Sequence, residues 1–108
     1  MTLLQKKCIP CEVGAVPLTR DEAETLRKQT PEWRLSDDAK KMSRSFKLKD
    51  FKEALAFVNK IGEIAEAEGH HPDIVLKWGG VGVELSTHSM HGLSENDFIL
   101  AAKIDGIE

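Results

Sequence analysis

The chain has 108 residues, of which 41% are hydrophobic and 31% are charged, as is ordinary for one globular domain. Its net charge is -3 and its sequence pI is near 5.8, so it lacks the basic field that nucleic-acid binding requires. No apolar run reaches the ~18 residues of a membrane span, and the N-terminus lacks the apolar core of a signal peptide. We therefore expect a cytoplasmic protein that binds neither nucleic acid nor membrane.

Residues 1–17 show no sustained periodicity, and we expect an irregular N-terminal leader followed by a single domain over 18–108. The leader contains Cys8 and Cys11 in a Cys-x-x-Cys spacing. A zinc site would need two further ligands, and a redox pair normally begins a helix, whereas Pro10 interrupts this one. Whether the two cysteines bind metal or are redox-active is left open, and we assign the protein no metal and no cofactor.

The first regular elements follow the leader. Thr19 and Glu22 have the spacing of a capping box, which predicts a helix that ends before Pro31. Residues 33–35 form a short strand candidate, and a polar turn follows them. Residues 41–48 then alternate between apolar and polar side chains, which indicates a second strand.

Asp50 begins the longest predicted helix, and Glu53 occupies its third helical position. We expect Gly69 to end this helix, because glycine readily adopts the left-handed conformation found after many helices. Apolar residues recur at helical spacing and predict one core-facing stripe, formed by Phe51, Ala54, Leu55, Val58, Ile61 and Ala65.

Two further strands are predicted over 74–78 and 81–87, joined by a two-residue Gly-Gly turn at 79–80. Ser94 has the features of the start of a last helix. Hairpins joined by helices, with no need for a parallel strand-helix-strand unit, predict an α+β fold. Its expected architecture is a four-stranded antiparallel sheet with three helices packed on one face.

Three of the four histidines lie where these elements meet. His70 and His71 follow the long helix, and His88 follows a hairpin that returns to the same end of the sheet, so the three can lie together. Glu66, one helical turn before His70, can approach the same place. Imidazole exchanges protons near neutral pH, and two adjacent imidazoles disfavour being charged together. The cluster therefore predicts a site with both an acid and a base, whereas His91 is expected to lie on the surface.

These residues resemble the motif of the pterin-4a-carbinolamine dehydratases. In that family an acidic residue precedes a His-His-Pro segment, an aromatic residue follows, nine residues separate it from another histidine, and an aspartate comes later. This chain fills the motif with Glu66, His70, His71, Pro72, Trp78, His88 and Asp97. The likeness covers about residues 17–105, and its several fixed spacings make it far more specific than a single dipeptide.

The resemblance implies removal of water from a 4a-hydroxytetrahydropterin, giving a quinonoid dihydropterin without a metal or redox cofactor. It also implies that His70, His71 and His88 are catalytic. The residues expected to contact the substrate are Glu66, Gly69, Pro72, Trp78, Ser86, Thr87 and Ser89. Two of them, Gly69 and Ser89, depart from the animal members, which have an aspartate and a glutamate there.

Two residues of the motif, Asp97 and Trp78, are interpreted separately from the histidines. Asp97 lies three residues after Ser94, so we expect it to cap a helix and to support the site rather than to react. Trp78 is expected either to stack on the substrate or to pack in the core, and the sequence does not choose between the two.

The resemblance implies a role in pterin recycling beside an aromatic amino-acid hydroxylase. The alternative is a pterin-binding or assembly module, since animal relatives also serve as dimerisation cofactors of a homeodomain transcription factor and some bacterial relatives are tied to molybdopterin metabolism. The order of elements leaves a strand edge exposed, and such an edge readily pairs with a second copy. We therefore also expect a homodimer or a homotetramer.

Overall fold

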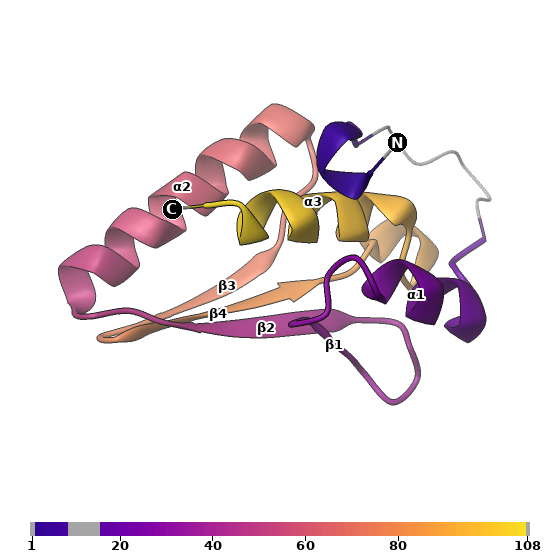
Figure 1. The fold of residues 1–108 in the computed structure, drawn as a ribbon, viewed down its shortest axis with the longest axis horizontal. Coiled ribbons are helices and arrows are strands. Elements are labelled where there is room, and N and C mark those ends of the chain that lie inside the picture. Colours follow the sequence, from indigo (N-terminus) through magenta and orange to yellow (C-terminus); the bar gives the residue numbers. More distant parts are fainter. Residues whose placement is uncertain (1, 9–15, 108) are drawn as a thin grey trace.

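A four-stranded antiparallel sheet forms one layer of the protein, and the helices pack against it (Figure 1). The structure is a computed structural model that describes residues 2–8 and 16–107. The predicted α+β class and the predicted order of helices and strands are confirmed. The elements are η1 (Leu3–Gln5), α1 (Arg20–Arg27), β1 (Arg34–Leu35), β2 (Met42–Lys47), α2 (Phe51–Glu68), β3 (Asp73–Lys77), β4 (Gly80–Leu85), η2 (His88–Met90) and α3 (Glu95–Asp105).

The local signals for helix ends are confirmed. The Thr19 hydroxyl accepts a hydrogen bond from the backbone N–H of Glu22 at the start of α1, over 3.2 Å. The Asp50 carboxylate accepts one from the N–H of Glu53 at the start of α2, over 2.9 Å. Gly69 follows α2 with φ 66°, the left-handed conformation that a residue without Cβ adopts at little cost. The backbone therefore turns sharply just before the histidine pair.

The strand order is β1-β2-β4-β3, so β3 lies at one edge of the sheet and β4 is central. The predicted Gly-Gly turn is wrong by one residue. Gly80 pairs with Lys77 of β3 and with Lys47 of β2, so it already belongs to the sheet. The turn is formed by Trp78 and Gly79 instead, because pairing on both sides holds Gly80 in the central strand.

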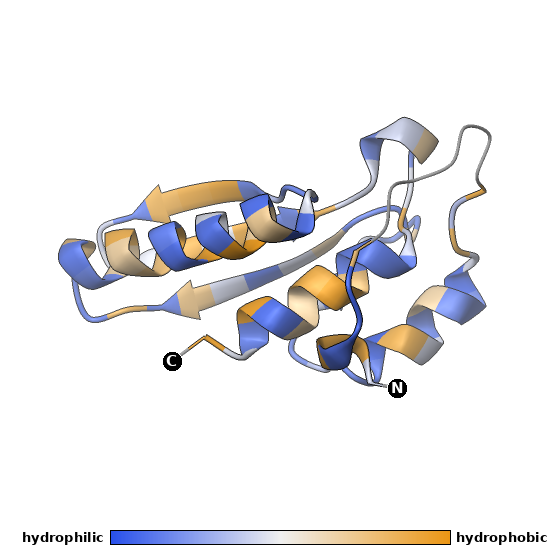
Figure 2. Cartoon of the chain, turned by 90° about the horizontal axis from the view of Figure 1, so that it is seen from above, coloured by the Kyte–Doolittle hydropathy of each residue, from blue (hydrophilic) through white to orange (hydrophobic). Residues whose placement is uncertain are grey.

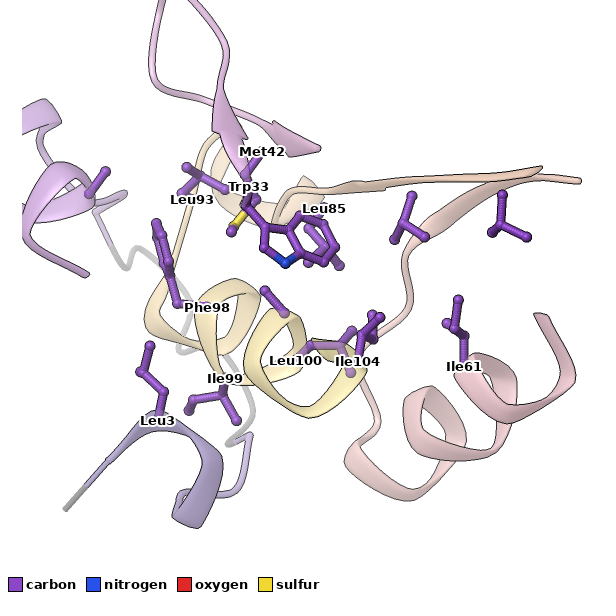
Figure 3. Close-up of a cluster of buried hydrophobic side chains, with 14 of the residues drawn as sticks. Leu3, Trp33, Met42, Ile61, Leu85, Leu93, Phe98, Ile99, Leu100 and Ile104 are labelled. Carbon is purple, nitrogen blue, oxygen red and sulfur yellow. The ribbon is translucent and has the colours of Figure 1, made fainter. Parts of the chain in front are cut away.

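The core lies between the sheet and α3 (Figure 3). Val81, Val83 and Leu85 of β4 alternate with more exposed residues and are at most 2% exposed. Most of α3 is buried against them, including Phe98, Ile99, Leu100, Ala101 and Ile104. A helix buried on most sides is the expected centre of a small core. The first turn of α3, which carries Asp97, is thus rigidly anchored.

The predicted stripe on α2 is only partly correct. Ala54, Ile61 and Ala65 are buried, but Phe51 and Leu55 are 45% and 42% exposed. Hydrophilic and hydrophobic residues alternate along α2, whereas the middle of α3 is predominantly hydrophobic (Figure 2). The N-terminal turns of α2 extend past the end of α3 and have less to pack against (Figure 1). Within the described residues, no helix combines the length and apolarity that crossing a bilayer requires.

The N-terminal residues take a larger part in the fold than an irregular leader would. Leu3 lies in η1, is 1% exposed and belongs to the hydrophobic core (Figure 3). Cys8 is half-buried and free. Whether Cys8 and Cys11 bind metal or are redox-active stays open, because Cys11 and Pro10 lie outside the described part of the chain.

Candidate active site

The ends of α2 and β4 and the start of α3 surround one cavity of about 450 Å³. Gly69 directs the chain from α2 to the histidine pair. The predicted strand over 81–87 ends two residues early, at Leu85, so Ser86 and Thr87 connect β4 to η2. The residues that line the cavity are Cys8, Glu68, Gly69, His70, His71, Ser86, Thr87, His88, Ser89 and Asn96. Seven of these ten are predicted site residues, drawn from two segments that are well separated in sequence.

His70 is held by a buried carboxylate. Its Nε2 lies 2.6 Å from Oδ1 of Asp97, whose side chain is fully buried, and the histidine side chain itself is 13% exposed. The other carboxylate oxygen, Oδ2, accepts hydrogen bonds from the Thr87 hydroxyl over 2.8 Å and from the Ser94 backbone N–H over 3.0 Å. Asp97 thus caps α3, as the sequence predicts, and at the same time contacts a predicted catalytic histidine directly.

His71 lies in a different environment. Its Nε2 is 2.5 Å from Oε2 of Glu66, and the two side chains are 60% and 79% exposed. Glu66, which was expected to approach the histidine cluster, thus contacts it at His71 and not at His70. Gly69 turns the chain at the end of α2, so that His71 rather than His70 lies against Glu66, while His70 faces Asp97.

His88 enters the cavity from a loop that the backbone fixes at both ends. Thr87 N donates to Gly92 O over 2.7 Å, and His91 N donates to His88 O over 3.2 Å. This closes η2 into a compact turn at the end of β4. His88 and His91 are both exposed, but only His88 lines the cavity with the histidine pair.

Trp78, Pro72 and Glu66 are not among the residues that line the cavity. Trp78 is 70% exposed at the tip of the β3–β4 hairpin. The five residues of β3 separate it from the His-His-Pro segment, and the six residue steps from Pro72 to Trp78 span roughly 20 Å at the rise of an extended strand. The structure therefore does not bring Trp78 to the histidines of its own chain. Core packing is wrong for this exposed side chain, and stacking on the substrate stays a prediction.

Comparisons with known proteins add a separate observation. The sequence model of the family described as Pterin 4 alpha carbinolamine dehydratase matches residues 16–107. The chain belongs to the pterin-4a-carbinolamine dehydratase family. This membership assigns it a dehydratase activity on a pterin.

Relatives of similar length support this assignment. A candidate pterin-4-alpha-carbinolamine dehydratase of Halorhodospira halophila is 50% identical over 107 residues, covering 99% of this chain and 98% of the relative. One from Methylococcus capsulatus is 53% identical over 104 residues, covering 96% and 91%.

Two solved structures share the fold. One is a transcriptional coactivator/pterin dehydratase from Brucella melitensis, with 34% identity, TM-score 0.77 and coverage of 82% and 95%. A pterin dehydratase-like protein identified as a RuBisCO assembly factor in the alpha-carboxysome has TM-score 0.59 at 21% identity, covering 68% of this chain and 86% of that one, and shows the fold alone.

Three residues of this pterin dehydratase line the cavity without having been predicted. They are Cys8, Glu68 and Asn96, and only the latter two lie within the matched family region. Burial and the nearby Glu68 carboxylate raise the pKa of the Cys8 thiol to about 12. Glu68 is the last residue of α2, and Asn96 lies in the first turn of α3. Each is close in sequence to residues of the motif, the histidine pair or Asp97, and this closeness is the signal that could have predicted them.

Among the described residues, no group of three or more His, Cys, Asp and Glu is arranged to hold a metal.

Proposed function

We propose that this pterin dehydratase removes water from 4a-hydroxytetrahydropterin by proton transfer to and from His70 and His88. The observation that carries the proposal is the buried contact between His70 and Asp97 at the wall of a cavity that His88 also lines. A cavity of about 450 Å³ has room for a bicyclic pterin. Imidazole is the side chain best suited to give and take protons at neutral pH.

The reaction needs one acid and one base. The acid protonates the 4a hydroxyl, and the C4a–O bond breaks with release of water. The base takes the N5 proton, and the electrons of the N5–H bond form the C4a–N5 double bond of the quinonoid dihydropterin. Hydroxide is a poor leaving group, so protonation makes departure far easier. One well-placed acid or base typically contributes about 10²–10⁴-fold to a rate.

We infer the roles of the two nitrogens of His70 from its contact with Asp97. An ionised carboxylate only accepts hydrogen bonds, so Nε2 carries the proton that points to Asp97. Nδ1 is then the nitrogen that exchanges a proton with the substrate. The same contact prevents rotation of the ring, which keeps Nδ1 aimed in one direction. His88 acts from the η2 turn as the partner acid or base, and His71 orients the substrate at the exposed rim.

Thr87 connects the two catalytic segments. Its hydroxyl donates to Asp97 Oδ2 and also lies 2.8 Å from the Ser94 hydroxyl. It directly precedes His88, so one buried carboxylate fixes both the ring of His70 and the start of the loop that carries His88. This shared support favours a single catalytic unit over two independent surface histidines.

We further propose that the protein works in the cytoplasm as a homo-oligomer, in pterin recycling linked to an aromatic amino-acid hydroxylase. The oligomer is supported by β3, an edge strand of five residues on which Val75 is 55% exposed. Sedimentation at micromolar concentration should give a dimer or a tetramer, and a monomer would contradict this part of the proposal. A neighbouring gene for phenylalanine hydroxylase rather than for molybdopterin synthesis would favour the recycling role over the alternative of a binding or assembly module.

The direct test is a dehydration assay on 4a-hydroxytetrahydropterin generated by a hydroxylase in the same cuvette, with the spontaneous rate subtracted. The wild-type protein should accelerate the dehydration. His70→Ala and His88→Ala should each lower kcat by about 10²-fold. The double variant should fall to near the spontaneous rate, and full activity in the double variant would contradict the assignment. His91→Ala is the matched control, because His91 lies on the same turn but outside the cavity.

A further inference from the structure

The N-terminal segment, residues 2–8, is attached to α3 and to the turn that follows α1. The backbone N–H of Leu3 donates to Oε1 of Gln29, and Nζ of Lys103 donates to the carbonyl oxygen of Leu4 over 3.1 Å. The Leu3 side chain is buried in the core beside α3 (Figure 3). The segment is therefore a fixed part of the fold over these residues.

Glu68 attaches the far end of this segment. Its Oε1 accepts a hydrogen bond from the backbone N–H of Cys8 over 2.8 Å, and its Oε2 lies 4.0 Å from Nζ of Lys103. The Glu68 side chain is only 12% exposed. A hydrogen bond to a partly buried carboxylate is shorter and stronger than one between neutral groups. One carboxylate thus connects the end of α2, α3 and the N-terminal segment.

Cys8 and Glu68 both line the cavity beside His70 and His71. Cys8 lies outside the region that the family model matches, which begins at residue 16. We propose that Glu68 is a positioning residue that holds Cys8 against the cavity, so that the N-terminal segment forms one wall of the pterin site and sets its affinity. The inference rests on the proposed function, because the ligand that contacts this wall is the pterin substrate.

The character of this wall suits a flat uncharged ring. Because the pKa of the Cys8 thiol is raised to about 12, the thiol is uncharged at neutral pH and behaves as a small apolar group. Its sulfur lies 3.5 Å from the carbonyl oxygen of Asn96, which holds it beside α3. A wall of this kind contributes to binding by contact and by exclusion of water, so its loss should affect substrate binding more than the chemical step.

The test measures two quantities in the full-length chain, the Kd of biopterin by fluorescence and kcat and KM for 4a-hydroxytetrahydropterin. Glu68→Ala removes the acceptor of the Cys8 N–H, and Glu68→Gln keeps an oxygen there. Cys8→Leu fills part of the cavity without disturbing Glu68. Glu63→Ala is the matched control, because Glu63 is an exposed acidic residue of the same helix that does not line the cavity.

Glu68→Ala should raise Kd and KM about tenfold while kcat stays within about twofold, since the loss falls on binding and not on the reacting groups. Glu68→Gln should restore most of the affinity, Cys8→Leu should weaken binding, and Glu63→Ala should behave as wild type. Wild-type affinity in both Glu68→Ala and Cys8→Leu would overturn the inference, as would a fall in kcat alone. Should Glu68→Ala not fold, Cys8→Leu decides. A wild-type protein that neither binds biopterin nor accelerates dehydration would instead overturn the proposed function.

Discussion

Two adjacent histidines of this pterin dehydratase have opposite environments. His70 faces a fully buried carboxylate, that of Asp97, which is also bonded to Thr87 and to the backbone of Ser94. His71 faces Glu66 on the surface, where both side chains are mostly exposed. The two contacts have nearly the same length, 2.6 Å and 2.5 Å. The distance between the histidine nitrogen and the carboxylate oxygen therefore does not distinguish the buried contact from the exposed one.

Burial is what separates the two contacts. An exposed pair of this kind is screened by water and salt, and such pairs contribute about 0–1 kcal/mol. A buried carboxylate with several donors interacts through a less polarisable medium, and removing it leaves those donors unsatisfied. The protein thus buries the carboxylate contact of one imidazole at the cavity and leaves that of its neighbour exposed to solvent.

The largest expected effect concerns Asp97. Asp97→Ala leaves three donors without their acceptor, so we expect the free energy of unfolding to fall by about 2–4 kcal/mol. Glu66→Ala, the matched change at the exposed pair, should cost less than about 0.5 kcal/mol. Urea denaturation of both variants measures the difference. Equal losses of unfolding free energy in the two variants would contradict the difference between the buried His70–Asp97 pair and the exposed His71–Glu66 pair.

Burial also affects Cys8, a half-buried residue that lines the cavity. A thiol whose pKa is raised from 9.0 to about 12 keeps its proton through neutral and mildly alkaline pH. In a Cys11→Ala background, alkylation of Cys8 by iodoacetamide at pH 8 should be at least about tenfold slower than that of a free cysteine, because only the thiolate reacts. Denaturation should abolish the protection.

The sign of the accompanying stability change follows from the same shift. The folded state keeps the Cys8 proton between pH 9.0 and about 12, where the unfolded state loses it. This contribution to stability is complete below pH 9.0 and disappears as the pH rises toward 12. In the Cys11→Ala background, Cys8→Ala should reduce the loss of unfolding free energy between pH 9.0 and about 12. If the dependence of the unfolding free energy on pH is the same with and without Cys8, the raised pKa of the thiol is contradicted.

The smallest expected effect concerns Glu66. Because Glu66 contacts exposed His71 and not His70, Glu66→Gln should leave the pH dependence of kcat unchanged. The wild-type profile itself should be bell-shaped around neutral pH, since one histidine must be protonated and another neutral. A shift of either limb in the variant would show that the exposed pair participates in proton transfer.

The sequence predicted the fold class, the element order, the helix caps and the convergence of three histidines. These features depend on local signals and on the geometry of a hairpin. It did not predict which carboxylate contacts which histidine, because the left-handed turn at Gly69 rotates the chain by an amount that spacing does not encode. It also missed Cys8 and Glu68, whose contact spans 60 positions of the chain and so has no local pattern. The exposure of Trp78 was not predictable either, because a motif spacing does not show that this residue lies in the turn of the β3–β4 hairpin.

The most direct test of the account is a comparison of His70→Ala with His71→Ala in the dehydration assay. We expect His70→Ala to lower kcat by about 10²-fold, because it removes the anchored group that exchanges the proton. His71→Ala should raise KM severalfold and leave kcat within about threefold, because its exposed imidazole orients the substrate. A loss of kcat in His71→Ala as large as that in His70→Ala would contradict the claim that the buried carboxylate selects the catalytic histidine.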